Sequence, residues 1–570
     1  MPHLIRDGSS RDVTSFYGYL KEGGFLNEEQ LKAGLDEQSR VRNSTFYSAL
    51  VRANILPEEQ LLQLSSAFFK VKRVENAYQT NVDFAATEKV MGSITNAVAE
   101  KMFCIHLDGR MTFVVTDPEN EIIRKKAATA LSDEPEYAVL SEKEFEILNQ
   151  YQLTPRAISE QADQIKVGAK SDSESEKGST SYLQQLLNML IDAALDRRAS
   201  DLHLQQMTPE TAQIILRIDG KPHFFSEIKA SVLANLRNRL KTLSGVGGEK
   251  LEDAVEGQIR AIHNGVPIDI RVNIVTTANG YDFCLRFIEA DLRRLEELGL
   301  SEANYQRYLK LLHMTKGLVI LCGPTGSGKT SLLYAGFKKL MPEYKMIYTI
   351  EDPVEIKLPG ITQISVNKEK KQTYAGLFPS ALRHDPDIIG IGETREIDVA
   401  RQVVQAANTG HLVFTTLHTN NSMGAISRLT TMGVDAYTVG DVLAAVIAQR
   451  LIRRVCTQCV EEYDLAADHF WRRRYNLGDG KITLKRGRGC AYCSGTGYRG
   501  RIAVDEVLLN SPKVRSLIQR NATSTELEEQ LREEGFEDYI KDGVDKALAG
   551  LTTFDEVDEL YRDIEAIERQ

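Results

Sequence analysis

The sequence predicts a multidomain α/β protein whose C-terminal domain is built on a parallel sheet. One observation is the stretch GLVILCGPTGSGKTSL at residues 317–332, where an apolar run, a glycine-rich turn and a helix-forming segment follow one another. Another is the series of apolar, strand-like runs that alternate with helical stretches after it. A third is the length of 570 residues, which is enough for three or four domains.

The glycine-rich turn fits the pattern G-x-x-x-x-G-K-[ST], which binds phosphate. Glycines let backbone N–H groups curl around phosphate oxygens, and the start of the next helix adds partial positive charge. In this pattern Lys329 reaches the β- and γ-phosphates of a nucleotide, and the Thr330 hydroxyl binds Mg²⁺. A turn that binds nothing would leave the Lys-Thr pair without a packing role. We expect nucleotide contacts from Gly323, Pro324, Thr325, Gly326, Ser327, Gly328, Lys329, Thr330 and Ser331.

The composition is that of a soluble globular protein, with 42% hydrophobic residues. No apolar run reaches the length of a membrane span, and the N-terminal MPHLIRDGSS lacks the apolar core of a signal peptide. We therefore expect a cytoplasmic protein. The net charge of −10 disfavours a nucleic-acid partner, because phosphate backbones attract basic surfaces.

An internal repeat opens the expected N-terminal region, residues 1–157. The segment at 19–35 recurs at 49–65. Asn27 and Pro57 occupy matching helix-start positions in the two copies, of N-cap and N1 type respectively. The repeat therefore predicts a pair of short helices that is used twice.

Beyond the repeat the pattern changes to mixed α and β. A hairpin of strands 102–106 and 111–115 is predicted, with helices near 119–130 and 142–151 to cover it. Residues 158–181 are polar and almost free of large apolar side chains, as is typical of a flexible linker.

Residues 182–297 are expected to form a smaller α/β middle domain. An amphipathic helix opens it, and strand-like segments follow, two of them as a hairpin around 278–280. Arg217, Arg271 and Arg286 lie on these strands, where they alternate with apolar residues. Such positions point away from the core, and ordinary surface arginines would also occupy them.

Three strand-like runs after the glycine-rich turn end in polar residues. KMIYTIEDPVE ends in Glu351-Asp352, DIIGIGETRE in Glu393, and HLVFTTLHTN in His418. Each run is apolar through its middle, as in strands buried on both faces of a parallel sheet. Because ligands sit at the carboxyl ends of such strands, we expect these residues to converge on the bound phosphates.

The residue types at the strand ends indicate roles. Glu393 ends a strand as a Walker B acid does and would hold Mg²⁺. Glu351 would orient or deprotonate the attacking water, although it could instead cap a turn. His418 could sense the γ-phosphate, although an isolated histidine is more often a hydrogen-bonded structural residue.

Four of the seven cysteines are clustered. Cys456, Cys459, Cys490 and Cys493 form two C-x2-C pairs that are thirty residues apart. Two such pairs make a tetrahedral Zn²⁺ site with no open position, so the metal would be structural. Disulfides are disfavoured in a reducing compartment. The sequence therefore predicts a tetracysteine zinc module at 456–493.

Taken together, these motifs resemble the secretion ATPase superfamily. GPTGSGKT, TIEDPVE, DPDIIGIGETRE, TGHLVFTTLHTN and AQRLIRRVCTQC occur in this order, and ASDLHLQ, RIDG and CSGTGYRGRIAVDEV extend the resemblance to the middle domain and the zinc region. The resemblance is to the type IV pilus assembly and type II secretion ATPases, and it covers nearly the whole chain. The related retraction ATPases lack the long N-terminal region and the tetracysteine segment, which favours extension or secretion.

This resemblance implies a RecA-like ATPase domain at 298–570. It also implies a homohexameric ring, in which each ATP lies between a middle domain and a RecA-like domain. Residue by residue, it places Glu351 and Asp352 in the Asp box, Glu393 in the Walker B motif, His411 and His418 in the His box, and Arg271 and Arg286, with Arg217 as a third candidate, among phosphate-sensing arginines.

The function implied is a cytoplasmic ATPase that acts on an inner-membrane platform protein and drives assembly of pilin or pseudopilin filaments. Its membrane association would be peripheral. One alternative is a nucleic-acid translocase or conjugation-type secretion ATPase, which the acidic balance disfavours. Another is a GTPase-like switch, but the guanine-reading motif N-K-x-D is missing, since Asn367-Lys368 continues as Glu369-Lys370.

Some relatives carry a two-unit repeat that binds cyclic di-GMP, each unit opening with Arg-Leu-Gly. Here Ser15-Phe16-Tyr17 and Thr45-Phe46-Tyr47 stand in those positions, so the arginine and the glycine are absent from both units. The aromatic residues would pack the core of the repeat or meet a protein partner. We expect residues 1–157 to bind no cyclic di-GMP and to dock a membrane-associated component.

Overall fold

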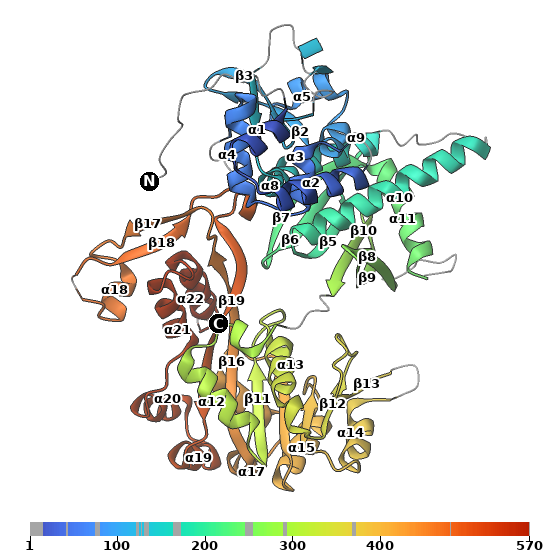
Figure 1. Ribbon diagram of the computed structural model, residues 1–570. Coiled ribbons are helices and arrows are strands. Elements are labelled where there is room, and N and C mark those ends of the chain that lie inside the picture. Colours follow the sequence, from blue (N-terminus) through green and yellow to red (C-terminus); the bar gives the residue numbers. More distant parts are fainter. Residues whose placement is uncertain are drawn as a thin grey trace.

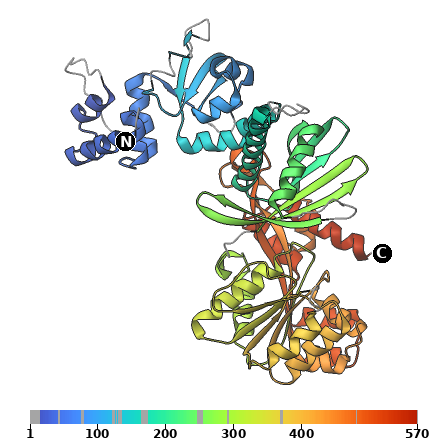
Figure 2. The same cartoon turned by 90° about the vertical axis from the view of Figure 1, so that its right-hand side faces the viewer.

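The computed structural model describes residues 15–41, 44–74, 80–120, 125–126, 128–129, 136–163, 173–245, 255–288, 293–367, 372–478 and 480–568. In Figure 1 the N-terminal region and the middle domain (blue to green) lie at one end of the molecule and the C-terminal domain (yellow to red) at the other. Figure 2 shows the N-terminal helices projecting away from both other parts. None of the described helices is long and apolar enough to cross a bilayer.

The N-terminal repeat folds, as predicted, into two helix pairs. Its helices are α1 (Phe16–Glu22), α2 (Glu28–Arg40), α3 (Phe46–Arg52) and α4 (Glu58–Phe69). Asn27 caps α2 through a capping box. Pro57 stands at the N-cap of α4 rather than at the first helical position, because its ψ of 131° is not helical and the helix begins at Glu58. Phe16, Phe46 and Tyr47 are at most 2% exposed, so these aromatic residues pack the core of the repeat.

A small mixed sheet with the strand order β1-β4-β3-β2 follows the repeat. Its strands are β1 (Lys72–Arg73), β2 (Met102–Leu107), β3 (Arg110–Val115) and β4 (Glu136–Val139). The antiparallel pair β2–β3 confirms the predicted hairpin. The helices of this part are α5 (Phe84–Met91), α6 (Ile94–Ala99), α8 (Glu142–Leu148), the π-helical turn η2 (Asn149–Leu153) and α9 (Thr154–Asp163). Residues 121–124, 127 and 130 of the helix expected near 119–130 lie outside the described residues.

Residues 158–181 differ from the flexible linker expected of them. Their first part belongs to α9, where Ile158 and Ala162 are at most 2% exposed and join the core of the middle domain. Their last part, from Ser173, belongs to α10 (Ser173–Asp196). Two apolar residues four positions apart lie on one helix face, so even a mostly polar segment can pack as a helix. Residues 164–172 of the expected linker lie outside the described residues.

The middle domain is a six-stranded antiparallel sheet with the order β7-β6-β5-β10-β9-β8. Its strands are β5 (Ala199–Gln206), β6 (Thr211–Ile218), β7 (Lys221–Lys229), β8 (Val255–His263), β9 (Val266–Thr277) and β10 (Gly280–Ile288). Side chains of α10 and α11 (Ala230–Leu243) share one core with alternate strand residues. The strand residues that alternate with these core residues therefore point to the other face of the sheet.

The C-terminal domain contains a seven-stranded sheet with the order β13-β12-β14-β15-β11-β16-β19. Its strands are β11 (Gly317–Cys322), β12 (Ile347–Glu351), β13 (Thr362–Ser365), β14 (Ile388–Ile391), β15 (Leu412–Leu417), β16 (Leu443–Val455) and β19 (Tyr498–Leu509). The first six are parallel, and β19 runs antiparallel to β16. Alternate residues of β11 join two different apolar clusters, so the sheet is buried on both faces, as predicted.

Helices cover both faces of this sheet (Figure 1). They are α12 (Glu302–Leu312), α13 (Lys329–Leu340), α14 (Tyr374–Leu382), α15 (Ile397–Asn408), α16 (Ser422–Thr431), α17 (Ala436–Val442), α19 (Pro512–Gln519), α20 (Ser524–Glu533), α21 (Tyr539–Leu548) and α22 (Phe554–Glu568), with 3-10 turns η3 (Leu295–Glu297) and η4 (Met341–Glu343). Between β16 and β19 the chain forms an insertion of β17 (Val460–Asp464), α18 (Phe470–Arg474), β18 (Thr483–Gly487) and η5 (Ala491–Cys493).

Candidate active site and metal centre

The glycine-rich turn at residues 323–330, which we call the phosphate loop, connects β11 to α13. Gly323 and Gly328 have φ values of +146° and +89°, and a Cβ at these positions would lie 2.5 and 2.7 Å from atoms of Gln449. Lys329 Nζ donates to the carbonyl oxygens of Gly323 and Pro324, at 2.8 Å each. Burial lowers the pKa of Lys329 to about 8. The loop thus combines a backbone that only glycine allows with an ammonium group at a helix start, which suits a phosphate ligand.

The strand ends named by the sequence lie at the same edge of the sheet as this loop. In the parallel register Cys322 is opposite Leu417, and Ile391 is opposite both Ile350 and Thr415. The residues that follow these positions therefore emerge side by side. The predicted convergence of the polar strand ends with the phosphate loop is seen in the structure.

The strand-end residues line a cavity of about 180 Å³ beside the phosphate loop. Thr330, Glu351, Asp352 and Glu393 are among its lining residues. Carboxylate and hydroxyl oxygens are the ligands that Mg²⁺ prefers. The donor set therefore fits a magnesium ion held between the loop and the strand ends.

Glu351 is 7% exposed, and its carboxylate is fixed by three side chains. Oε1 accepts from Thr349 Oγ1 at 2.5 Å and from Gln363 Nε2 at 3.2 Å, and Oε2 accepts from the hydroxyl of Tyr334. Tyr334 belongs to α13, the helix that starts at Lys329. The side-chain partners of this carboxylate are thus residues of its own strand, the neighbouring strand and the loop helix.

Glu393 lies between two cationic or titratable groups. Arg395 Nη2 is 2.7 Å from Glu393 Oε2, and His418 Nε2 is 3.4 Å from the same oxygen. Burial and the nearby Lys329 lower the pKa of His418, which Glu393 only partly offsets. The imidazole is therefore held in its neutral form at neutral pH, next to an acid that could hold a metal ion.

The structure does not bring His411 to this group. His411 precedes β15 and His418 follows it, so the strand separates them by about 20 Å. His411 donates from Nδ1 to the carbonyl oxygen of Ala406 at 3.2 Å. A strand presents its two ends on opposite edges of a parallel sheet, so the two histidines cannot meet one ligand within one chain.

The three arginines of the middle domain lie in one row across its sheet. Arg286 is opposite Asp201 and Arg271, and Asp201 is also opposite Arg217. Directly opposed residues share a sheet face, which explains why all of these side chains point the same way. Asp201 is 3% exposed and accepts from Arg286 Nε at 2.8 Å. Sequence reasoning missed this acid, although it lies within the motif ASDLHLQ that was singled out.

A second cavity, of about 360 Å³, separates this row from the phosphate loop. Arg271 and Arg286 line it from the middle domain, and Thr330 lines it from the loop. Arg271 Nη1 is also 4.0 Å from Glu355 Oε1, beyond the end of β12. Arg217 is not among the lining residues and donates instead to the carbonyl oxygen of Gly220 at 2.9 Å.

Other arginines line the same cavity without having been named from the sequence. They are Arg198, Arg293 and Arg501. Arg198 follows the first middle-domain helix, and Arg501 lies on β19, so they reach the cavity from different sides. Arg501 lies within the stretch CSGTGYRGRIAVDEV, but its place at this cavity could not be predicted, because only the fold brings these positions together. The cavity is thus strongly basic, as a site for several phosphate groups requires.

The four clustered cysteines are all buried, and their sulfur atoms lie within 4.8 Å of one another. The Cys456–Cys490 and Cys459–Cys493 Sγ separations are 3.9 Å, and Cys490–Cys493 is 3.7 Å. A Zn–S distance of about 2.3 Å in a tetrahedron gives sulfur separations of ~3.8 Å. The arrangement therefore fits a tetrahedral zinc ion.

Local backbone geometry supports the cysteine cluster. The Cys456 thiol and the backbone N–H groups of Cys490 and Gly497 lower the pKa of Cys493. A Cβ at Gly487 would lie 2.1 Å from the carbonyl oxygen of Gly497. Glycines thus let two chain segments meet directly beside the sulfur atoms.

Comparison with known proteins gives a consistent assignment. A family model described as type II/IV secretion system protein matches residues 176–559. The type IV pilus assembly ATPase PilB of Thermus thermophilus is 35% identical over 390 residues, which is 68% of this chain and 43% of that protein. The type II secretion system ATPase E of Vibrio cholerae is 33% identical over 376 residues, 65% of this chain and 74% of that protein.

Two solved structures share the fold at low sequence identity. The DotB ATPase of Legionella pneumophila is 18% identical, with a TM-score of 0.50, over 66% of this chain and 96% of its own. The DotB ATPase of Yersinia pseudotuberculosis is 19% identical, also with a TM-score of 0.50, over 70% and 96%. These likenesses confirm the predicted RecA-like fold class.

Proposed function

Because the chain belongs to the type II/IV secretion system protein family, we propose that it hydrolyses ATP to power assembly of a type IV pilus or a type II secretion pseudopilus. The observation that carries the proposal is the convergence of the phosphate loop, Glu351 and Glu393 on one cavity. A positively charged loop beside a pair of acids is the arrangement that phosphoryl transfer to water requires.

Each residue of the site has a role in this proposal. Lys329 and the N–H groups of the loop hold the β- and γ-phosphates. Thr330 and Glu393 hold Mg²⁺, which when bound offsets the charge that develops on the phosphates. Glu351, fixed by three donors, orients the attacking water and takes its proton. His418, kept neutral, can donate a hydrogen bond to the γ-phosphate.

Arg271 and Arg286 reach the phosphates when the cavity between middle and C-terminal domains closes. The C-terminal domain would hold ATP, and the middle domain would supply the arginines. Hydrolysis would therefore be linked to the angle between the two domains. We include a homohexameric ring in the proposal, supported by the resemblance to secretion ATPases. In such a ring His411 would lie at a subunit contact, because it lies away from the site of its own chain.

The proposed partner is an inner-membrane platform protein, reached from the cytoplasm by peripheral association. The names of the relatives support a pilus or secretion machine. Extension rather than retraction is supported by the long N-terminal region and by the tetracysteine module, which the retraction ATPases lack.

The N-terminal repeat is proposed to dock a membrane-associated component and not cyclic di-GMP. At the positions where an arginine would be needed, Ser15 accepts from Gly18 N at 3.1 Å and Thr45 accepts from Ser48 N at 3.0 Å. Both hydroxyls cap helices. The residues at these positions thus serve the fold of the repeat, which argues against a dinucleotide site there.

The test is an ATPase assay of the full chain, with Lys329→Ala as the inactive variant and Lys513→Ala, an exposed lysine on α19, as the matched control. We expect Mg²⁺-dependent turnover in the wild type and in the control, and none in Lys329→Ala. Single- and double-stranded DNA should not raise the rate. Stimulation by DNA would favour the nucleic-acid translocase, and a wild type without turnover would contradict the proposed function.

A further inference from the structure

The loop that follows His418 is held in place by contacts from two strands. Arg450 Nη2, on β16, donates to the carbonyl oxygen of Asn420 at 3.0 Å. Cys322 Sγ, at the end of β11, donates to the carbonyl oxygen of Asn421 at 3.4 Å. The second contact joins this loop to the strand that leads into the phosphate loop. The position of His418 is thus set by more than its own strand.

A buried carboxylate makes the shortest contacts to this loop. Glu506 lies on β19 and is 3% exposed. Its Oε1 accepts from both the backbone N and the Oγ of Ser422, each at 2.7 Å. Ser422 is the first residue of α16 and follows His418 by only four positions. A buried donor or acceptor that loses its partner keeps the full cost of desolvation, so these two hydrogen bonds restrict the loop closely.

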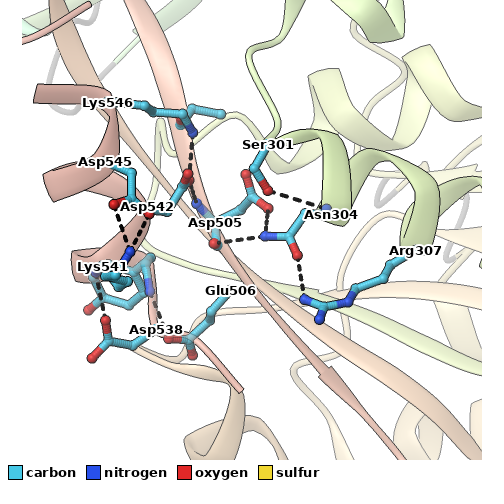
Figure 3. Close-up of polar contacts among 12 residues, drawn as sticks. Ser301, Asn304, Arg307, Asp505, Glu506, Asp538, Lys541, Asp542, Asp545 and Lys546 are labelled. Atoms are coloured by element: carbon cyan, nitrogen blue, oxygen red, sulfur yellow. Dashed lines mark hydrogen bonds and ion pairs between the residues drawn. The ribbon is translucent and has the colours of Figure 1, made fainter. Parts of the chain in front are cut away.

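The other oxygen of Glu506 contacts a different helix. Oε2 accepts from the backbone N of Tyr539 at 3.3 Å, at the first residue of α21. Figure 3 shows Glu506 on its strand beside the start of α21, near Asp538, whereas the adjacent Asp505 points toward Asn304 of α12. One carboxylate therefore joins the start of α16 to the start of α21.

We propose that Glu506 is a positioning residue for His418, and that it transmits the position of the His418 loop to α21. The inference rests on the proposed ATPase function. Removing Glu506 would lower the stability of the protein even if Glu506 served the fold alone. Only if Glu506 positions His418 would its substitution lower turnover through His418. The two roles therefore differ in whether the effects of the Glu506 and His418 substitutions on kcat are additive.

The test is a double-mutant cycle with Glu506→Gln and His418→Ala in the full chain. Glutamine keeps the shape of the side chain, but its NH2 group must face either the Ser422 donors or the backbone N–H of Tyr539, so the link between the two helix starts is broken. We expect Glu506→Gln to lower kcat about tenfold at unchanged KM for ATP, and to change kcat by less than about twofold when His418 is already alanine. Equal effects of Glu506→Gln in both backgrounds would overturn the inference.

The matched control is Glu556→Gln. Glu556 is also a buried carboxylate, 5% exposed, and it accepts from the backbone N of Arg453 at 2.8 Å and from that guanidinium. Its loss should lower stability, and its effect on kcat, if any, should be the same with or without His418. Non-additivity with His418 in this control too would overturn the assignment to Glu506.

A milder variant keeps the test valid if Glu506→Gln does not fold. Ser422→Ala removes one of the donors to Glu506 and leaves the backbone N–H in place. We expect a smaller loss of kcat that again disappears when His418 is alanine. If the wild type hydrolyses ATP and both variants match it, this inference alone fails. A wild type without turnover would instead overturn the proposed function and this inference with it.

Discussion

Glu393 shares its carboxylate between Arg395 and His418, which makes it a sensitive probe of the site. Glu393→Gln should still bind ATP, because the phosphate loop is untouched. Its turnover should fall by about 100-fold or more, because an amide cannot replace a carboxylate beside Mg²⁺. Turnover and the affinity for a fluorescent ATP analogue measure the two effects.

The control for this substitution is Glu396→Gln. Glu396 is an exposed acid three residues further on, and it makes no side-chain cap to α15. We expect the rate of this variant to equal that of the wild type. Near wild-type turnover of Glu393→Gln would show that the assignment of the Walker B acid is wrong.

In the arginine row of the middle domain, Arg271 and Arg286 face the cavity beside the phosphate loop, so their substitution should affect hydrolysis. Arg271→Ala and Arg286→Ala should lower kcat more than they weaken nucleotide binding, because an arginine brought in by domain closure acts mostly on the transition state. Arg260→Ala is the control, since Arg260 lies on the same sheet with a side chain that is 80% exposed and pairs with Asp269. If all three variants behaved alike, these would be ordinary surface arginines.

Asp505 gives a pH-dependent prediction. It is 1% exposed, Oδ2 accepts from Asn304 at 2.7 Å, and within the described residues Oδ1 has no partner. Burial and the neighbouring Asp542 raise its pKa to about 7. A carboxyl whose folded pKa lies above its unfolded value of about 4 favours the folded state in the protonated form. Its contribution to stability is therefore lost as pH rises from about 4 to 7.

Asp505→Asn should remove this loss. We expect the Tm of the variant to exceed that of the wild type by roughly 2–4 °C at pH 8, and the two to converge near pH 5, where Asp505 is protonated. Thermal unfolding at both pH values measures the difference. Asp545→Asn, which changes an exposed acid paired with Lys541 on α21, should show no such trend. A Tm difference that is the same at both pH values would contradict this account.

At the scale of elements, the patterns that repeat along the chain were the most predictive. Apolar strands, helix starts and the hairpin at 102–115 follow from residues that are local in sequence. The prediction of a flexible linker at 158–181 was wrong for its first residues, because Ile158 and Ala162 are buried only by packing against a sheet whose strands come later in the sequence. Composition averages over a segment, whereas packing needs only two residues on one face.

The candidate site, too, could be predicted from the sequence only in part. Parallel strands that end in polar residues converge by geometry, so Glu351, Glu393 and His418 could be placed together in advance. The separation of His411 from His418 also follows from strand length, but only once the bounds of β15 are known. Asp201 and Glu506 could not be found from spacing, because their partners lie on strands or helices remote in sequence.

The two cysteine pairs form an element that a metal should stabilise. We expect about one Zn²⁺ per chain in protein purified without chelators. Cys490→Ser should reduce the metal content and lower the Tm, because formation of the site is coupled to local folding. Cys284→Ser, a half-buried cysteine on β10, is the control and should keep the metal. Metal analysis that finds no zinc in the wild type would exclude this centre.

At the scale of the whole molecule, the tetracysteine insertion also contacts the N-terminal region. Ala491 and Tyr492 are the two residues between Cys490 and Cys493, and both join the apolar cluster of the N-terminal sheet. Arg499 stacks on Tyr492, with its guanidinium 3.9 Å from the centre of the ring. The same guanidinium donates a hydrogen bond of 2.6 Å to the carbonyl oxygen of Tyr492. The turn that carries two of the four clustered cysteines is therefore also the turn that touches the N-terminal region.

This arrangement predicts that Tyr492→Ala loosens the contact while the metal stays bound. An alanine leaves the four thiols intact but removes the ring that packs against the apolar cluster containing Leu148 and Leu153. Hydrogen exchange in α8 and η2 should become faster, and the zinc content should not change. Val460→Ala, an exposed position on β17 of the same insertion, is the control and should leave exchange in α8 unchanged. Cys490→Ser should speed the same exchange with loss of metal, because a bound ion would help to fix the turn. Unchanged exchange in both Tyr492→Ala and Cys490→Ser would mean that the N-terminal region is held by other contacts.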